Sequence, residues 1–204
     1  MQVRQLKIEG AYEFTPQVFG DARGVFLSPY QEDVFTKAVG RPLYPVVQSS
    51  YSVSKRGVVR GIHFTAIPPG MGKYAYCTRG KAVDYIIDTR VGSPTFGMWD
   101  SVELDPQDRR SVHIPIGVGH LFVALEDDTT ISYLLSTGYE PQREHAIHPL
   151  DPDIALPYPQ GLDLVLSDRD RAAPTLAEAK ELGILPDYAQ SLRLDARSGA
   201  VRGG

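Results

Sequence analysis

The chain has one cysteine, Cys77, among its 204 residues. Because a lone cysteine forms no disulfide within the chain, we expect a reducing compartment, the cytoplasm. No apolar run approaches the roughly 20 residues that a membrane helix needs, and the first ten residues lack the apolar core of a signal peptide. The formal net charge of −4 gives no basic surface for nucleic acid. We therefore expect neither a membrane nor a nucleic acid as partner.

Several catalytic motifs are also missing. The chain has no Gly-x-Ser-x-Gly elbow, no phosphate-binding loop and no dinucleotide fingerprint, so hydrolase, kinase and hydride-transfer activities lack support. No two histidines have the one-residue gap that puts two metal ligands on one strand face. His145 and His148 are three residues apart without an obvious third ligand, so we expect no metal. Cys77 lacks a matched histidine and is interpreted as a core thiol.

Short segments rich in β-branched and aromatic residues recur along the chain, and 19 glycines and 16 prolines supply turns between them. Many short antiparallel strands in one domain predict an all-β sandwich or barrel. The predicted strands lie within residues 44–54, 58–64, 73–79, 81–88, 97–104, 111–116, 120–126 and 129–136.

Helix signals are sparse. A short helix is expected over residues 31–38, and a second begins at Thr175, where Glu178 completes a capping box and Gly183 ends the helix. No linker divides the chain. We expect one domain over residues 1–190 and a flexible tail over residues 191–204.

The segment VVRGIHF (58–64) combines a strand pattern with two charged or titratable residues. Strict alternation puts Arg60 and His63 on opposite faces of this strand. A bulge near Gly61 would let both line one cavity. A surface arginine and a satisfied core histidine are the alternative interpretation.

Other strands show the same pattern: polar side chains interrupt apolar runs at Gln48, Lys73, Asp84, His120 and Tyr133. Titratable groups inside a barrel are costly unless they are paired or used. Residues of this kind on several strands indicate a polar cavity, which is the usual form of a binding or active site.

These residues stand within longer motifs in a fixed order: DARGVF (21–26), VVRGIH (58–63), GK (72–73), RVGSPTFG (90–97), IPIGVGHLF (114–122), Tyr133, Tyr139, DP (151–152) and LSDRD (166–170). In this the chain resembles the dTDP-4-dehydrorhamnose 3,5-epimerase family, a branch of the cupin jelly-roll fold with a few short, mainly C-terminal helices. SVSKRGVVRGIHF and RVGSPTFG are most similar to the wording of actinomycete epimerases of antibiotic deoxysugars.

The resemblance implies an isomerase that acts on a dTDP-linked 4-keto-6-deoxy sugar at carbon 5, carbon 3 or both, with single-site action at carbon 5 favoured. The ketone acidifies the neighbouring C–H bonds and accepts the electrons as an enolate. The reaction therefore needs no cofactor.

The resemblance also implies residue roles. His63 is the base, oriented by Asp170, and Tyr133 is the acid on the opposite face of the sugar. Lys73 and His120 stabilise the enolate oxygen, and Asp84 holds Lys73.

The implied substrate contacts come from further residues. The diphosphate would bind Arg23 and Arg60, thymine would lie between Phe26 and Tyr139, and Gln48 and Ser50 would add polar contacts. A homodimer with N-terminal strand exchange is implied too, in which Arg23 and Phe26 serve the neighbouring subunit.

The chain departs from the family pattern at four positions: Ser28 replaces a glutamate, Ser50 an asparagine, and His148 and Tyr158 replace tryptophans. The catalytic positions match, so the departures concern nucleotide affinity and sugar preference. Two alternatives stay open: a metal-dependent cupin oxygenase and a non-catalytic sugar-binding barrel.

Overall fold

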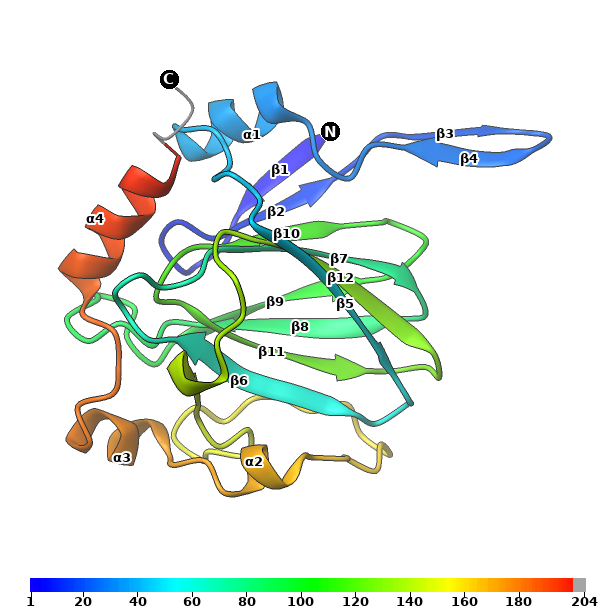
Figure 1. Ribbon diagram of the computed structural model, residues 1–204. Helices are drawn as coiled ribbons and strands as arrows, with labels where there is room; N and C mark the ends of the chain where they lie inside the picture. The colour runs from blue at the N-terminus through cyan, green and yellow to red at the C-terminus, as the bar shows by residue number, and fades with distance from the viewer. Residues whose placement is uncertain (200–204) are drawn as a thin grey trace.

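The computed structural model describes residues 1–199. Within them, two antiparallel sheets pack face to face and a two-stranded hairpin projects from one end (Figure 1). This architecture confirms the predicted all-β, cupin-type sandwich with few helices. In the same residues, no helix has the length and apolar content that crossing a membrane requires.

The larger sheet has the strand order β1-β2-β10-β7-β12-β5, with bounds Gln2–Gln5, Tyr12–Thr15, Ser111–Ile114, Lys73–Arg79, Thr129–Leu135 and Gln48–Ser54. The smaller sheet has the order β13-β6-β11-β8-β9, with bounds Glu144–Ala146, Val59–Thr65, Gly119–Ala124, Ala82–Ile87 and Trp99–Leu104. The projecting hairpin pairs β3 (Val18–Asp21) with β4 (Gly24–Leu27).

Each predicted strand segment contains an observed strand for most of its length, and β7 coincides with the predicted 73–79. Strands β1 to β4 and β13 were not predicted. Each has four residues or fewer, which is too short for a pattern of period two to stand out.

The core lies between the sheets, where inward-facing apolar residues of both meet, among them Val112 and Ile131 from the larger sheet and Ile86 and Phe122 from the smaller. A second cluster covers the outer face of the smaller sheet with residues from the C-terminal segment, including Leu156 and Leu176. The smaller sheet is thus buried on both faces, and this explains why β11 is apolar on both faces apart from His120.

The predicted helices are present as α1 (Glu32–Val39) and α3 (Leu176–Glu181). The Thr175–Glu178 capping box has both of its hydrogen bonds, and the chain leaves α3 through Gly183 at a φ of 68°. Two further helices follow from local capping, α2 (Asp168–Arg171) behind Ser167 and α4 (Tyr188–Ser198) behind Asp187. A single 3-10 turn spans Pro141–Arg143.

Helix α4 corrects the expected tail over residues 191–204. Residues 191–198 are helical, because Asp187 caps the helix and Asp195 anchors it to the body of the protein. Asp195 forms an ion pair with Arg41 and accepts a hydrogen bond from the Ile116 amide at 3.1 Å. The rest of the predicted tail, residues 200–204, lies outside the described residues.

The motif RVGSPTFG has a structural role. Arg90 and Asp88 are fully buried and form two hydrogen bonds of 2.8 Å, while the Ser93 and Thr95 hydroxyls donate to the same carboxylate. The Arg90 guanidinium also lies 5.2 Å from the ring centroid of Tyr188 in α4. The network ties the β8–β9 connection to the C-terminal helix.

His113 on β10 is buried against α1, with its ring 5.0 Å from that of Phe35. Burial lowers the pKa of His113 to about 4. Between pH 6.5 and 4 the unfolded chain therefore binds a proton at this histidine that the folded chain does not bind, and stability falls as the pH falls.

We expect this histidine to make the fold sensitive to acid. From pH 7 to pH 4.5, the free energy of unfolding of the wild type should fall by about 2 kcal/mol more than that of His113→Gln, which has no titrating group there. Denaturant unfolding at both pH values measures the difference. Equal losses in the two proteins would contradict it.

Candidate active site

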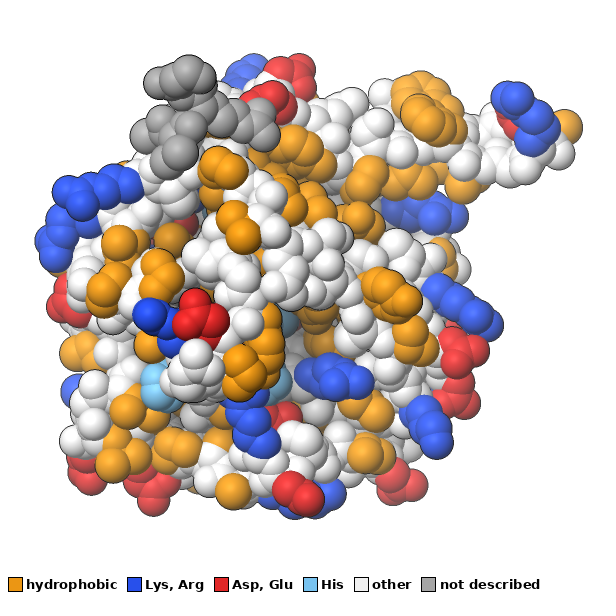
Figure 2. Space-filling model, in the orientation of Figure 1, with side chains coloured by type: hydrophobic (Ala, Val, Ile, Leu, Met, Phe, Trp, Pro, Cys, Tyr) orange, Lys and Arg blue, Asp and Glu red, His pale blue; other side chains and the backbone are white. Residues whose placement is uncertain are grey.

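A cavity of about 660 Å³ opens between the sheets. Its lining comes from β5, β6, β7, β11 and β12, together with the segment that leads into α2. The face drawn in Figure 2 is hollowed here, beside basic side chains. Nine of the twelve residues predicted to be functional line this cavity; the exceptions are Asp84, which is buried behind it, and Arg23 and Phe26.

Arg60 and His63 both line the cavity, although strict alternation would separate them. The register between β6 and β11 shifts, so that His120 and Phe122, two residues apart, pair with His63 and Arg60, three apart. Gly61 sits in this irregularity with a φ of 134°, and a Cβ there would lie 2.5 Å from the His120 carbonyl oxygen. The predicted bulge near Gly61 is confirmed.

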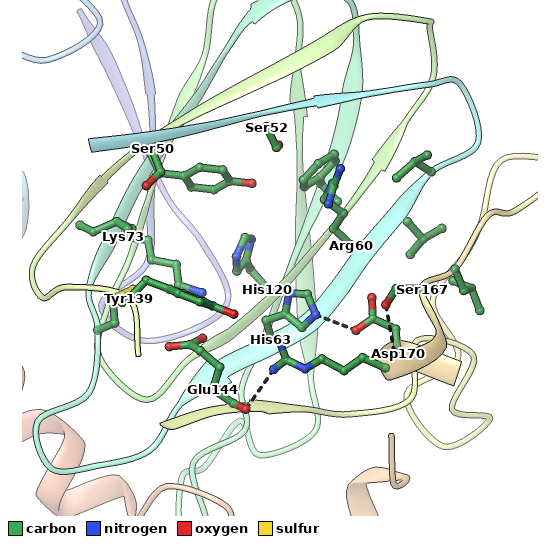
Figure 3. A pocket seen from close by; sticks show the side chains of 18 of the residues that line it. Ser50, Ser52, Arg60, His63, Lys73, His120, Tyr139, Glu144, Ser167 and Asp170 are labelled. Carbon is green, nitrogen blue, oxygen red and sulfur yellow. Dashed lines mark hydrogen bonds and ion pairs between the residues drawn. The ribbon is translucent and has the colours of Figure 1, made fainter. Parts of the chain in front are cut away.

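His63 and Asp170 form a hydrogen bond of 2.7 Å between Nε2 and Oδ1 (Figure 3). Asp170 is buried on α2, and its backbone amide donates to the capping hydroxyl of Ser167. Burial opposes ionisation, but the hydrogen bond and charge of His63 lower the pKa of the Asp170 carboxyl. In the tautomer whose Nε2–H donates to this carboxylate, Nδ1 keeps a lone pair, which is what a general base needs.

Lys73, Asp84 and His120 form a buried polar group beside His63. The His120 Nδ1 lies 3.4 Å from Asp84 Oδ1. Burial lowers the pKa of the Lys73 ammonium, against the opposing charges of Glu144 and Asp84. Burial also lowers the pKa of His120 well below its ordinary value, and the charge of Lys73 adds to this, so His120 is a neutral hydrogen-bond donor near pH 7.

Burial raises the pKa of Asp84 well above its ordinary value, and Lys73 opposes the shift. Asp84 lies 3.4 Å from His120 and acts on Lys73 through its charge, so the predicted role of holding Lys73 is supported only electrostatically. The group presents two hydrogen-bond donors, Lys73 and His120, to one region of the cavity (Figure 3).

Tyr133 on β12 lies across the cavity, with its ring centroid 5.9 Å from that of His120. Burial raises the pKa of the Tyr133 phenol well above its ordinary value, and the nearby charge of Asp84 raises it further. The phenol is therefore protonated near neutral pH and available as a proton donor.

The polar residues of β5 support the cavity wall. Gln48 accepts a hydrogen bond from the Tyr139 amide at 2.9 Å and donates to the Ser50 hydroxyl at 2.9 Å. Ser54 accepts from Arg60 Nε at 3.1 Å. In the structure Gln48 and Ser50 thus contact each other and the loop that carries Tyr139, whose side chain is exposed at the cavity mouth.

Sequence reasoning missed several cavity residues, notably Ser52, Glu144, Ser167 and Arg169. Glu144 accepts a hydrogen bond from Thr65 at 2.7 Å, and Arg169 donates to the Glu144 carbonyl at 2.9 Å. Neither was singled out from the sequence, because no local pattern identifies them as cavity residues. Only the packing of β13 and α2 against β6 brings them to the cavity.

Two predicted binding residues lie elsewhere. Arg23 and Phe26 are on the β3–β4 hairpin, which extends away from the sandwich (Figure 1), and they are absent from the cavity lining. The Arg23 side chain pairs with Asp21 in its own turn, and Phe26 is 71% exposed. Within this chain, therefore, the hairpin does not contribute to the cavity.

The remaining sequence features have structural partners. His148 Nδ1 accepts from the Leu150 amide at 3.1 Å, and Tyr158 donates to the Pro149 carbonyl, so both shape one loop. Cys77 is buried, and burial raises the pKa of its thiol to about 11, as a core thiol requires. Among residues 1–199, no group of three or more metal-ligating side chains is arranged to hold an ion.

Comparison with known proteins identifies the same family that the sequence motifs resemble. The family model of dTDP-4-dehydrorhamnose 3,5-epimerase matches residues 5–178. A dTDP-4-dehydrorhamnose 3-epimerase of Streptomyces niveus is 51% identical, covering 93% of this chain and 90% of its own. A dTDP-4-dehydrorhamnose 3,5-epimerase of Mycolicibacterium smegmatis is 48% identical, covering 93% and 92%.

Solved structures agree with these matches. NovW, a 4-keto-6-deoxy sugar epimerase from the novobiocin biosynthetic gene cluster of Streptomyces spheroides, superposes with a TM-score of 0.90 at 50% identity, over 94% of this chain and 95% of its own. ChmJ, a 3'-monoepimerase from Streptomyces bikiniensis in complex with dTDP-quinovose, gives a TM-score of 0.90 at 43% identity, over 96% and 98%.

Proposed function

Since the chain belongs to the dTDP-4-dehydrorhamnose 3,5-epimerase family, we propose that it epimerises a dTDP-linked 4-keto-6-deoxy sugar next to its ketone. The observation that carries this proposal is the cavity, which has a carboxylate-held histidine on one side and a neutral tyrosine on the other. Deoxysugar biosynthesis for an antibiotic is the context we propose, and the cytoplasm is the location.

The reaction begins at His63. Its Nδ1 lone pair takes the proton from the carbon beside the ketone, and Asp170 stabilises the imidazolium that forms. The electron pair of the broken C–H bond moves onto the ketone oxygen. Lys73 and the neutral His120 donate hydrogen bonds to the enolate, where one such donor is typically worth about 3 kcal/mol of barrier.

Inversion requires a proton from the other face of the sugar. Tyr133 supplies it: its O–H bond breaks, a new C–H bond forms, and the ketone is restored. The proton gained by His63 and the proton lost by Tyr133 then exchange with solvent, so the reaction is neutral overall. The ketone acts as the electron sink, and we propose no cofactor.

The same cavity wall provides nucleotide contacts. Arg60 presents a guanidinium that matches diphosphate oxygens, and Ser54 holds it in place. Tyr139 offers a ring at the mouth for thymine, held there through its backbone by Gln48. Ser50 accepts a hydrogen bond from the Gln48 amide, so its part in nucleotide binding is indirect.

Carbon 3 is the position that we propose for the reaction. The two curated relatives and ChmJ are named as 3-epimerases or 3,5-epimerases, and none of these names describes action at carbon 5 alone. The sequence-based preference for carbon 5 alone is therefore not kept.

The test is solvent exchange. The enzyme is incubated with dTDP-4-keto-6-deoxyglucose in deuterated water, and deuterium at each sugar carbon is followed by NMR. We expect deuterium at carbon 3 together with inverted product. A substrate that binds and gains no deuterium at carbon 3 or carbon 5 would instead indicate a non-catalytic sugar-binding barrel.

We also propose that a second copy of this chain completes the site through the β3–β4 hairpin. Phe19, Val25 and Phe26 on the hairpin are more than half exposed, as are Val47 and Tyr51 near the exposed edge strand β5. Apolar side chains gathered on protruding elements are typical of a subunit interface. In such a dimer Arg23 and Phe26 would reach the partner's cavity.

A mixing experiment tests this exchange. Arg23→Ala/Phe26→Ala lacks the hairpin contacts and His63→Asn lacks the base, so each homodimer should be nearly inactive. After random reassociation, half of the dimers are mixed and one of their two sites is intact, so about a quarter of wild-type activity should return. No recovery would mean that the hairpin does not serve a partner.

A further inference from the structure

The inward face of β5 carries a row of polar side chains, and all but one of them have a partner. Gln48 and Ser50 hydrogen-bond to each other, and Ser54 accepts from Arg60. Ser52 lies between Ser50 and Ser54 on the same face and lines the cavity. Ser52 is the one member of this row that has no role in the catalytic steps or nucleotide contacts proposed above.

The Ser52 hydroxyl has no hydrogen bond of normal geometry within residues 1–199, although it is near enough to Tyr133 to influence its phenol. Its Oγ is buried. Leaving a buried hydroxyl unpaired costs about 1–3 kcal/mol. Ser50 and Ser54 on either side of it both have partners, so the lack of one at Ser52 calls for an explanation.

The register of the sheet places Ser52 beside Tyr133. On β12, Tyr133 pairs with Ser50 and Ile131 pairs with Ser52, so the Tyr133 side chain has a serine opposite it and Ser52 on the adjoining diagonal. Cross-strand diagonal neighbours are within reach of an aromatic side chain. Burial and Asp84 raise the pKa of Tyr133, and two groups oppose this rise: Arg60 through its charge, and the Ser52 hydroxyl as a hydrogen-bond partner of the phenol.

We propose that Ser52 is a positioning residue for Tyr133. The Ser52 hydroxyl hydrogen-bonds to the tyrosine oxygen while the phenol gives up its proton. The inference rests on the proposed epimerase function. When the Tyr133 O–H bond breaks, the enolate electron pair forms the new C–H bond and the tyrosine is left as a phenolate. Ser52 keeps its own proton and donates a hydrogen bond to that phenolate.

The need for such a donor follows from the surroundings of the phenolate. It forms in a buried site that contains the Asp84 carboxyl, and burial disfavours the charged form. Arg60 is the cation that opposes this, but its Nε is engaged by Ser54 and its guanidinium faces the diphosphate in the proposed complex. A neutral hydroxyl that rotates toward the phenolate stabilises it without burying a further charge.

The test compares Ser52→Val with Ser52→Thr, which have nearly the same shape and differ in the hydroxyl. With dTDP-4-keto-6-deoxyglucose we expect Ser52→Val to lower kcat for inversion by roughly tenfold to a hundredfold. Its KM should change less than about twofold, and exchange of deuterium at the reacting carbon should be retained, because His63 is intact. Ser52→Thr should keep kcat within about threefold of the wild type.

Ser54→Ala on the same strand face is the matched control. It removes the partner of Arg60 and should raise KM rather than lower kcat. Equal kcat in the Val and Thr variants would overturn the role of Ser52, as would a change confined to KM or a parallel loss of exchange and inversion. If the wild type itself exchanges no deuterium, the proposed epimerase function fails and this inference fails with it.

Discussion

Replacing His63 by asparagine is expected to lower both deuterium exchange and inversion by about a thousandfold, within the range that loss of a general base produces. Asparagine retains a donor for Asp170 but has no basic nitrogen near neutral pH. Loss of the first step stops everything after it, so exchange and inversion should fall together. Single-turnover NMR in deuterated water measures both quantities from one sample.

Asp170→Asn supplies the companion measurement for His63. The amide removes the charge that stabilises the imidazolium and disturbs the hydrogen bond that fixes the ring, so the loss should have the same pattern. Thermal unfolding of both variants controls for stability. Full exchange in His63→Asn would show that another group is the base.

Tyr133→Phe should separate the two halves of the reaction. The variant keeps His63, so proton removal and exchange at the reacting carbon continue. The opposite face of the sugar, however, loses its proton donor. We expect inversion to fall by roughly a hundredfold while exchange stays within about threefold of the wild type. The ratio of deuterated substrate to inverted product is the readout.

The substitution is close to isosteric, since it removes one oxygen from a packed ring. The interaction between the ring and His120 is kept, so the unfolding temperature should change little. Full inversion in Tyr133→Phe would refute Tyr133 as the acid. Loss of exchange along with inversion would place Tyr133 in the first step instead.

Much of the sandwich was predictable because its longer strands combine period-two patterns with clear turns. Gly80 ends β7 with a φ of 73°, and Gly57 precedes β6 with a φ of 87°, so glycine marks both strand boundaries. The short strands carry too few residues for such a pattern. Helix α4 was hidden by a polar composition, and Asp195 holds it through contacts with residues far away in sequence.

The site residues also divide into those that a local sequence pattern identifies and those that only tertiary packing brings together. His63, Lys73 and His120 were identifiable because each interrupts an apolar strand, whereas the role of Asp170 came only with the family resemblance. Glu144 and Arg169 lie outside strong patterns and reach the cavity through tertiary packing. Ser52 is a small polar residue in a polar strand, and only the register between β5 and β12 brings it near Tyr133.

The irregularity at Gly61 also determines which changes in chain length this protein tolerates. In most strands, inserting or deleting one residue moves every following side chain to the opposite face of the sheet. Proteins therefore usually accept such changes in the loops between strands. Here the extra residue between Arg60 and His63 is itself what lets these two side chains, the proposed phosphate ligand and the proposed base, share one wall of the cavity. Removing one residue between Arg60 and His63 would restore regular pairing between β6 and β11. It would also turn one of the two side chains out of the cavity. A deletion at this point would therefore make the strand more regular but would separate the two side chains that the proposed active site needs together.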